Sequence, residues 1–562
     1  MTDKAKVKLY RERKKKLWSE RSGNNWDSHW QELSNYIHPR ALRLHASRRN
    51  KGTKQTSFIK NSTATFASRI LSSGMHAGNT PPSRPWFRLG AFDPQQRTEH
   101  GVRDYLGNVR DILLEMFART NVYNAFPRIY RHLGDFGTAC MLVLEDEQDI
   151  FRCHVLSPGT YALSQDSQMR VDTLYRTVQL TARQIEQQWP ERGSQPVQDA
   201  IKNNRLDEIF EVVNCIEPNE EANPALFEPG GMPWRSVWFE EKSTEESILG
   251  EGGFRSKPFM APRWEVEGED SYGNCPGMEA LPDIKSLQHL ERRKAQLMDK
   301  LVNPPMQGPG SLRSEVAGLL PGMITYLDSA TGQKFEPAFV PDARGLQIQN
   351  DMERYEFRIN RAYFADLFLM LANTAISGMT AREVEERHEE KMLQLGPVLE
   401  RINDELLDPF IDRTFDIGNN RGLLPDPPKE LEGQQTKIEY LSILAQAQKL
   451  VATVGVERTM SFVLANAEVF KDMPDKINSD LMIEQYADMN GVDPDMINSD
   501  EKAAEIRARR AEQQQQAEQA QMQAAALKDT ATAAKAAGDT DLTNLAALNQ
   551  QLGQTGAPGV VN

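Results

Sequence analysis

The sequence predicts an α+β fold that is mainly helical, and three observations lead to this prediction. Apolar residues recur every three or four positions over 278–302 and 346–372, which is the period of an amphipathic helix. Short runs rich in β-branched and aromatic residues follow one another from Ala139 to Glu267, which is typical of strands. Prolines and glycines gather at 304–345, between the two helical segments. The 562 residues suffice for about three to four domains at roughly 150 residues each.

The composition limits what the chain can bind. It carries 66 basic and 80 acidic residues, a net charge of −14, so bulk attraction to DNA is not expected, although DNA could pass along it without being gripped. The four cysteines form no CxxC pair, which predicts reduced thiols rather than a zinc site or a disulfide framework. No apolar run approaches the ~20 residues of a membrane span, and the N-terminus lacks the apolar region of a signal peptide. We therefore expect a protein that is cytoplasmic where it is made and has no membrane partner.

The N-terminal region begins with a basic segment. Residues 4–21 carry nine Lys or Arg, and aromatic and aliphatic residues from Trp18 to Ile37 follow at mostly helical spacing, so we expect one helix with a basic start. The basic residues either form a solvated face or contact DNA or an acidic neighbour. A second helix is predicted over 57–77, ended by Gly78, and the three prolines of the following NTPPSRPWFRLG require an extended chain.

The middle of the chain alternates between strands and turns. Five segments are predicted to be strands: ACMLVLE, FRCHVLS, VDTLYRTVQL, IFEVVNCIE and SVWFEE. One helix interrupts them, starting at the capping box of Thr181 and Gln184 and ending at Pro190. GEGGFRSK at 250–257 is predicted to be a hairpin turn.

Two long helices with an insert between them follow. The helix over 278–302 has a stripe that Lys294 interrupts, formed by Leu287, Leu290, Leu297 and Leu301. The insert at 304–345 holds six prolines and six glycines among short strand-like pieces such as MITYLD. The helix over 346–372 completes an antiparallel pair that carries a small subdomain at its tip.

A breaker and a kinked helix come next. NTAISGM at 373–379 interrupts the helical pattern, and a capping box at 380–383 starts a helix that runs toward Phe415. Gly396-Pro397 is expected to kink this helix, and Pro409 to kink or end it.

The C-terminal part is helical in two different ways. Residues 436–500 are predicted to be helical and compact. The Gln/Ala-rich tail after them favours helix but offers little to bury. It therefore forms either a helical bundle with symmetry mates or a frayed tail, and both alternatives stay open.

The stretch SYGNCPGMEALPDIK at 271–285 has the glycines and proline of a phosphate-binding turn before a helix, but neither GxxxxGK[ST] nor GxGxxG occurs. Glu279 and Asp283 lie where the helix would begin and would compete with a phosphate. Pro282 fits a first turn, where its missing N–H costs nothing. We therefore interpret the stretch as a sharp entry into a helix.

No motif of the sequence predicts catalytic residues, metal ligands or a cofactor. Eight of the nine histidines precede residue 290 without an HExxH pattern or a close pair, and GxSxG does not occur. Of the histidines, His132 and His154 are the most expected to be buried. EDEQD at 145–149 is predicted to be a charged turn between two strands rather than a metal-binding cluster.

Three long motifs carry a family resemblance. TPPSRPWFRL, YGNCPGMEALPDIKSL and MTAREVEERHEEKMLQLGPVLERINDELLDPFIDRTF resemble the head-to-tail connector (portal) proteins of short-tailed tailed bacteriophages, the podoviruses, over roughly residues 10–500. The resemblance implies a non-enzymatic, dodecameric ring at one capsid vertex whose channel passes double-stranded DNA during packaging and ejection. It implies contacts with the terminase packaging motor, then the tail adaptor, and with the major capsid and scaffolding proteins. The protein would be assembled in the host cytoplasm and reside in the virion at the head–tail junction.

Mapped onto this chain, the resemblance implies the following regions: wing 1–277, stem helix 278–303, clip 304–345, stem helix 346–372, tunnel loop 373–379, kinked wing helix 380–429, crown 430–500, and tail or barrel 501–562. The tunnel loop at the DNA channel would comprise Asn373, Thr374, Ala375, Ile376, Ser377 and Gly378. Stem charges near DNA or neighbouring subunits would be Lys285, Arg292, Arg293, Lys294 and Lys300. Clip residues that dock the motor or adaptor would include Pro304, Pro305, Gly308, Arg313, Tyr326 and Lys334.

Two other classes of protein fit the sequence less well. A nuclease or packaging ATPase needs a tight carboxylate set or a Walker motif, and the sequence has neither. A tail adaptor would normally be shorter, and a scaffold would not need the aromatic, strand-rich region. The connector is therefore the favoured hypothesis.

Overall fold

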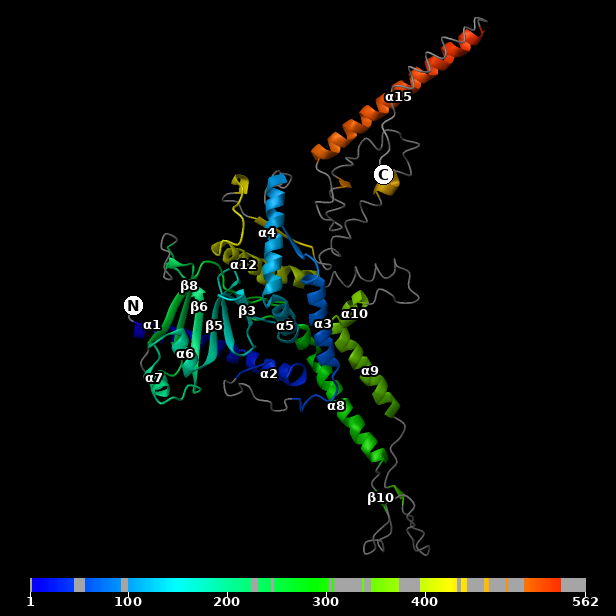
Figure 1. The fold of residues 1–562 in the computed structure, drawn as a ribbon. Coiled ribbons are helices and arrows are strands. Elements are labelled where there is room, and N and C mark those ends of the chain that lie inside the picture. Colours follow the sequence, from blue (N-terminus) through cyan, green and yellow to red (C-terminus); the bar gives the residue numbers. More distant parts are fainter. Residues whose placement is uncertain are drawn as a thin grey trace, which may run out of the picture. The chain divides into compact units, whose positions relative to one another are not determined.

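The computed structural model describes residues 3–44, 56–91, 100–223, 231–243, 247–302, 306–307, 336–337, 345–372, 395–431, 436–441, 459–463, 482–483 and 500–536. The chain divides into two compact units, Met1–Val451 and Ala452–Asn562. Figure 1 places the helices and strands along the chain. The mixture of helices and strands confirms the predicted α+β class.

A five-stranded antiparallel sheet has the order β4-β5-β6-β7-β8. Its strands are β4 (Tyr161–Gln165), β5 (Val171–Thr181), β6 (Ile209–Pro218), β7 (Trp234–Glu240) and β8 (Ile248–Phe254). The predicted strands within β5, β6 and β7 are confirmed, whereas β4 and β8 were not predicted.

The hairpin turn predicted at 250–257 is wrong, because its first five residues belong to strand β8. The register of the sheet pairs Trp238 of β7 with Gly250. A Cβ on Gly250 would lie 2.3 Å from Nε1 of Trp189, so this glycine admits an aromatic ring instead of making a turn.

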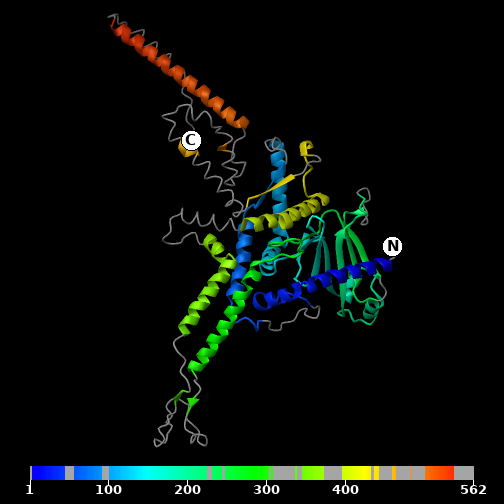
Figure 2. The same cartoon turned by 180° about the vertical axis from the view of Figure 1, so that it is seen from behind.

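Helices cover both faces of this sheet, because alternate strand residues place apolar side chains on each face. Helix α1 (Asp3–Gly23) lies across one face (Figure 2). Its residues Val7 and Tyr10 pack against Val213 and Val237. On the other face lie α6 (Ala182–Gln188), with the predicted capping box, and α7 (Gln195–Lys202), which was not predicted.

The basic N-terminal segment forms two helices, so the prediction of one helix is wrong. Helix α1 ends at Gly23, and α2 (Trp26–Tyr36) starts after Asn25. Asn25 has φ 62°, a left-handed conformation that asparagine tolerates better than most residues.

The largest core lies between the small sheet β3-β2-β9 and the helices around it. The elements are β2 (Met141–Asp146), β3 (Ile150–Val155), β9 (Phe259–Met260), α4 (His100–Arg119) and α5 (Val122–Phe136). The acidic turn between β2 and β3 is confirmed, since the Asp146 carboxylate accepts the N–H groups of Gln148 and Asp149. His132 is buried as predicted, but His154 is exposed, because alternate residues of β3 point to solvent.

A two-stranded ribbon joins distant parts of the chain. Strand β1 (Phe87–Ala91), in the segment predicted to be extended, pairs antiparallel with β12 (Thr436–Tyr440). The helix predicted to begin at residue 436 is therefore wrong for 436–440. The partner strand satisfies backbone groups that a helix would satisfy internally, and Ile438 packs against the core opposite Leu89.

Helices α3 (Thr63–Asn79), α8 (Pro276–Val302), α9 (Gly345–Ala362) and α10 (Ala365–Ala372) lie together beside this core. Helix α3 starts later than the predicted residue 57, because the Asn61 side chain accepts the Thr63 N–H. The predicted helix over 346–372 is broken, since Phe364 has φ 53°. Helix α10 packs on α3 at Gly74, where a Cβ would lie 2.2 Å from Phe368 Cδ1.

Helix α8 begins at Pro276, so the prediction that Pro282 lies in its first turn is wrong. Pro276 occupies the first helical position, where its missing N–H costs nothing, and Pro282 lies inside the helix beyond the first turn. The two-residue strands β10 (Met306–Gln307) and β11 (Glu336–Pro337) pair antiparallel beyond the pair α8 and α9. The rest of the predicted clip, MITYLD included, lies outside the described residues.

The kinked helix is described from residue 395 onward, so its predicted capping box at 380–383 lies outside the described residues. Residues 395–402 are helical and continue into a π-turn (Asn403–Leu407) and α12 (Asp408–Asn420). Pro409 thus distorts the helix without ending it. A short 3₁₀ turn (Lys429–Leu431) follows.

In the second unit, α15 (Asp500–Ala536) confirms helix formation in the tail. Its side chains from 504 to 526 are exposed, and both alternatives for the tail stay predictions. No helix among the described residues is long and apolar enough to cross a membrane.

Candidate functional site

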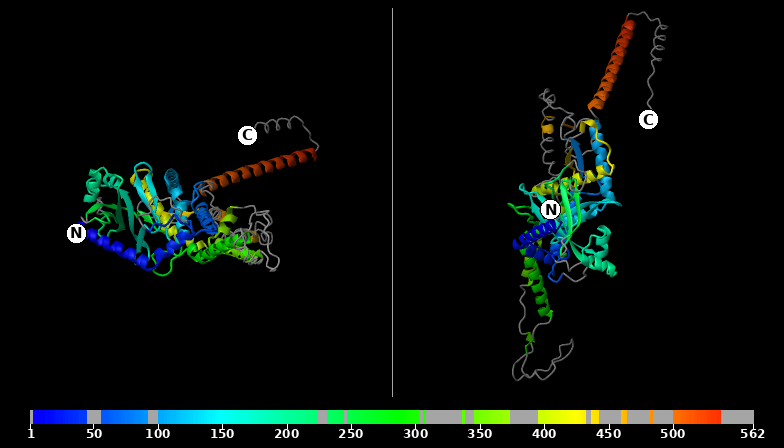
Figure 3. Two further views of the ribbon diagram at one scale, coloured as in Figure 1. Left: turned by 90° about the horizontal axis from the view of Figure 1, so that it is seen from below. Right: turned by 90° about the vertical axis from the view of Figure 1, so that its left-hand side faces the viewer.

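The candidate functional site is the helix pair α8 and α9, which carries the charges predicted to lie near DNA or neighbouring subunits. The two helices are antiparallel, as two contacts show. Arg358 Nη1 donates to Asp283 Oδ1 at 3.2 Å near the start of α8, and Lys294 Nζ donates to Gln349 Oε1 at 2.6 Å further along it. Figure 1 labels the two helices next to each other, and Figure 3 gives two further views of the fold. The geometry of the pair therefore depends on how the first turns of α8 and the end of α9 are fixed.

The chain entering α8 passes very close to the end of α5. A Cβ on Gly273 would lie 2.6 Å from the carbonyl oxygen of Gly137 and 2.8 Å from that of Glu265. A Cβ on Gly277 would lie 2.9 Å from the carbonyl oxygen of Asp135. Backbone fills the space beside these glycines, so the glycines of this stretch serve close packing at a helix entry.

The buried carboxylate of Asp135 fixes the end of α9 against α5. The carboxylate lies 3.1 Å from His38 Nδ1 and accepts a hydrogen bond from the Tyr363 hydroxyl at 3.5 Å. It also forms an ion pair with Arg131 Nε at 3.6 Å. Burial, and then the negative charge of Asp135, raise the pKa of Tyr363 well above its usual value, so its hydroxyl stays protonated and donates. Since Gly277 packs against the same residue, Asp135 links the start of α8 to the end of α9.

A second fixed point lies about three turns into α8, at Gln288. The buried Gln288 side chain of α8 accepts the N–H groups of Lys60 and Asn61 at 2.5 and 2.8 Å, and donates to the Asn61 carbonyl at 2.7 Å. The Asn61 amide in turn donates to Glu356 of α9 at 2.9 Å. The segment before α3 therefore bridges both helices, and a buried glutamine on an otherwise apolar stripe is the sequence signal of this contact.

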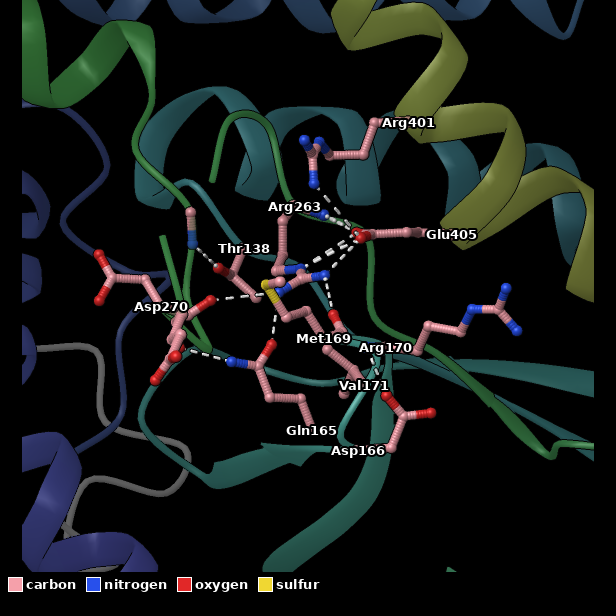
Figure 4. A network of polar contacts seen from close by, with 12 residues as sticks. Thr138, Gln165, Asp166, Met169, Arg170, Val171, Arg263, Asp270, Arg401 and Glu405 are labelled. Carbon is pink, nitrogen blue, oxygen red and sulfur yellow. Dashed lines mark hydrogen bonds and ion pairs between the residues drawn. The ribbon is translucent and has the colours of Figure 1, made fainter. Parts of the chain in front are cut away.

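A third fixed point is the buried guanidinium of Arg263, shown in Figure 4. Its Nη2 and Nε donate to Glu405 at 2.6 and 3.1 Å, and the Arg263 N–H donates to the same carboxylate at 2.8 Å. Nη1 donates to the Gln165 side chain at 3.1 Å and the Asp270 carbonyl at 3.2 Å, while Nη2 also donates to the Met169 carbonyl at 2.9 Å. We call these five residues the Arg263 junction. They join the β4–β5 hairpin, the chain entering α8, and the kinked helix.

The predicted stem charges differ in their surroundings. Lys285 forms an ion pair with Glu32 of α2 at 2.7 Å and so is engaged within the chain. Lys294 is half-buried against α9, whereas Arg292, Arg293 and Lys300 are exposed on α8. The tunnel-loop residues 373–378 and the six named clip residues lie outside the described residues. Of the predicted charges, Arg292, Arg293 and Lys300 are thus the most exposed to solvent.

The basic N-terminal helix contacts acidic residues of its own chain. Lys6, Arg13 and Lys14 of α1 form ion pairs with Glu251, Glu217 and Glu241 on the adjoining sheet and the turn after it. For these three residues, the contact with an acidic neighbour that the sequence left open is made to the sheet of the same chain.

Buried titratable groups are poorly suited to chemistry. Burial raises the pKa of the Cys140 and Cys153 thiols to about 12, so both stay protonated at neutral pH. Burial, together with the nearby His38 and two arginines, lowers the pKa of His132 to about 3 and keeps the ring neutral. Within the described ranges, no group of three His, Cys, Asp or Glu residues is arranged to hold a metal ion.

Comparison with known proteins decides the family. The model of the family described as bacteriophage head to tail connecting protein matches residues 7–497. The chain belongs to this family. It is 41% identical over 522 residues to the probable portal protein of Bordetella phage BPP-1, covering 92% of this chain and 94% of that one. It is 40% identical over 537 residues to the portal protein of Salmonella phage epsilon15, covering 95% and 96%.

Membership of the connector family confirms the resemblance found in the sequence and favours it over a scaffold, an adaptor or a packaging enzyme. Among solved structures, a chain from the virion of a native gene transfer agent particle aligns with 12% identity and a TM-score of 0.36, covering 77% of this chain and 91% of that chain. The relatives therefore carry the assignment.

Proposed function

We propose that this chain is a subunit of a phage portal: a ring at one capsid vertex whose channel passes double-stranded DNA during packaging and ejection. The observation that carries the proposal is the identity of about 40% to two portal proteins over more than nine-tenths of the chain. Heterologous contacts between identical subunits close into a ring when the rotation between neighbours closes.

In this proposal, α8 and α9 are the stem helices that line the channel, and 304–345 is the clip between them. Residues 373–379 are the tunnel loop, and the sheet with the kinked helix forms the wing. Residues 430–500 form the crown and 501–562 a tail or helical barrel. Strand β12 supports the wing from within the proposed crown segment, because it pairs with β1.

The electrostatics agree with transport instead of tight binding. A net charge of −14 works against a strong grip on phosphates, which would slow the movement of DNA. Arg292 and Arg293 are exposed on α8, and we propose that they either pair with acidic groups of a neighbouring subunit or form one weak ring of phosphate contacts. The chain then acts without catalysis of its own, as a conduit and assembly platform.

The proposed partners follow from this position. They are eleven further copies in a dodecamer, the terminase motor, the tail adaptor, and the major capsid and scaffolding proteins. The site of action is the head–tail junction of the virion, after assembly in the host cytoplasm.

Electron microscopy of the purified full-length chain tests the proposal. We expect rings with a central hole, and a particle mass that is a multiple of the 63.6 kDa chain. Monodisperse monomers at every salt concentration and protein concentration tried would contradict it. Metal-dependent DNA cleavage or ATP hydrolysis by the pure protein would favour the packaging enzyme instead.

A further inference from the structure

The kinked helix owes its shape to Pro409. In a regular α-helix, the ring of a proline clashes with the carbonyl four residues earlier, here that of Glu405, and supplies no N–H. The chain avoids the clash with a π-turn, in which the Asp408 N–H donates to the Asn403 carbonyl five residues earlier. The wider turn holds one extra residue, so the helix before it is rotated by about 100° relative to a continuous α-helix.

Burial along the helix shows which of its faces is packed. Before the π-turn, the buried residues Leu395, Leu399 and Ile402 follow the usual three- and four-residue spacing. At the turn Leu406 and Leu407 are both buried, and Phe410 and Ile411 are buried in α12 after it. The packed face thus continues through the π-turn, whose geometry sets the rotation of the 395–402 helix relative to α12.

Glu405 lies inside the π-turn, and its carboxylate is held by Arg263. All five guanidinium N–H groups of an arginine can donate in a fixed plane, and here each of the three nitrogens has partners within the Arg263 junction. A planar fork of this kind fixes direction as well as distance. The other partners, Gln165 and the Met169 and Asp270 carbonyls, belong to the wing hairpin and to the chain that enters α8.

Stability alone is a poor reason for such a contact. Burying the charge of Arg263 costs solvation energy, and well-packed apolar residues of similar volume often replace a buried ion pair with no loss of stability. What an apolar pair cannot reproduce is the orientation that the fork imposes on the π-turn. The Arg263 junction thus ties the phase of the kinked helix to the entry of α8.

We propose that Arg263 and Glu405 are positioning residues for DNA passage: they fix the kinked helix against α8, and packaging depends on this fixed orientation. The inference rests on the proposed function, because it assumes that α8 lines the channel. A change in the angle between the two helices would then reshape the channel while each helix stays folded.

The test replaces the pair by apolar residues in the full-length chain, as R263M/E405L. E405L leaves the buried charge of Arg263 without a carboxylate, and we expect it to form few rings. R263M leaves Glu405 partly exposed and paired with Arg401 at 3.7 Å, so we expect a smaller loss of rings. The double variant should recover the ring yield of the wild type but package about tenfold less DNA per particle, a size typical of coupling between sites. Arg413, buried on α12 and outside the junction, supplies the matched control: R413M rings should package DNA as the wild type does.

A milder variant covers the case in which the double variant does not fold. E405Q keeps the volume and one oxygen acceptor of Glu405 but weakens the fork. It should form rings, package less DNA, and show faster hydrogen exchange over 403–409 than the wild type. Wild-type packaging and exchange in E405Q, or wild-type packaging in R263M/E405L, would overturn the inference. Absence of rings from the wild-type chain would contradict the proposed function instead. The comparison of hydrogen exchange over 403–409 between E405Q and the wild type would still decide whether Arg263 and Glu405 fix the π-turn.

Discussion

At the residue scale, Asp412 on α12 offers a direct test of the electrostatics. Partial burial, and then the carboxylates of Asp408 and Asp416 one turn to either side, raise the pKa of Asp412 to about 6. The folded state therefore binds this proton more tightly than the unfolded state, where an aspartate titrates near a pKa of about 3.9. The resulting stability is fully present below about pH 4 and is lost as the pH rises through about 6.

We therefore expect D412N to raise the unfolding temperature above that of the wild type at pH 7.5, and to lose this advantage toward pH 4. The effect should be small, because the Asp412 side chain also reaches solvent, which screens the repulsion. Thermal unfolding followed by circular dichroism across this pH range measures it. D207N, at an exposed position away from the cluster, is the control, and an equal gain in both variants would show that net charge alone is responsible.

At the scale of elements, α1 shows which kind of contact holds a surface helix. Its ion pairs include Arg13 with Glu217, in which the arginine side chain is 50% exposed, and such pairs contribute about 0.2–1 kcal/mol. Its apolar contacts centre on Val7 and Tyr10, which are buried on the sheet face. Removing a large buried aromatic side chain costs about 3–5 kcal/mol in a well-packed core.

We expect Y10A to expose α1 to hydrogen exchange and to limited proteolysis, whereas R13A leaves both close to wild type. The comparison should be made at low salt and at 0.5 M salt. At the higher concentration the Debye length lies in the range of roughly 3–10 Å, so screening weakens the exposed ion pairs further. Equal protection losses in the two variants would show that charge, and not burial, docks the helix.

The elements also show what the sequence could predict. Strands β2, β3, β5, β6 and β7 were predictable, because their β-branched and aromatic runs are bounded by turn residues. The break at Asn25 has a local signal in Gly23-Asn24-Asn25, which the prediction of one helix did not use. The break at Phe364 has no such signal, because tertiary contacts such as Tyr363 with Asp135 decide the conformation there. Strand β12 pairs with a segment about 350 residues away, which no local pattern reveals.

The same limit applies to the site. The helices of the pair and their exposed arginines were predictable from periodicity and charge. Arg263 and Glu405 are 142 residues apart, and each is unremarkable in its own segment. Only the placement of Glu405 four residues before Pro409 hinted that this turn needs a special geometry.

At the scale of the whole molecule, the proposed tunnel loop predicts how the ring treats DNA. The segment NTAISGM carries no charge, so we propose that it restrains DNA by steric contact and not by ion pairing. It follows α10, which packs on α3 at Gly74. Deleting Asn373 to Gly378 should therefore leave ring formation intact and impair DNA packaging or retention.

The matched variant keeps the length of the loop and adds charge, as S377K. A ring of lysines at this position would attract phosphates in every subunit at once, so packaging should slow, and more so at low salt than at high salt. Packaged DNA per particle and its retention after heating measure both variants, with ring yield as the control. A deletion variant that forms no rings would place the segment in the subunit interface, and a salt-independent S377K phenotype would show that DNA does not pass close to it.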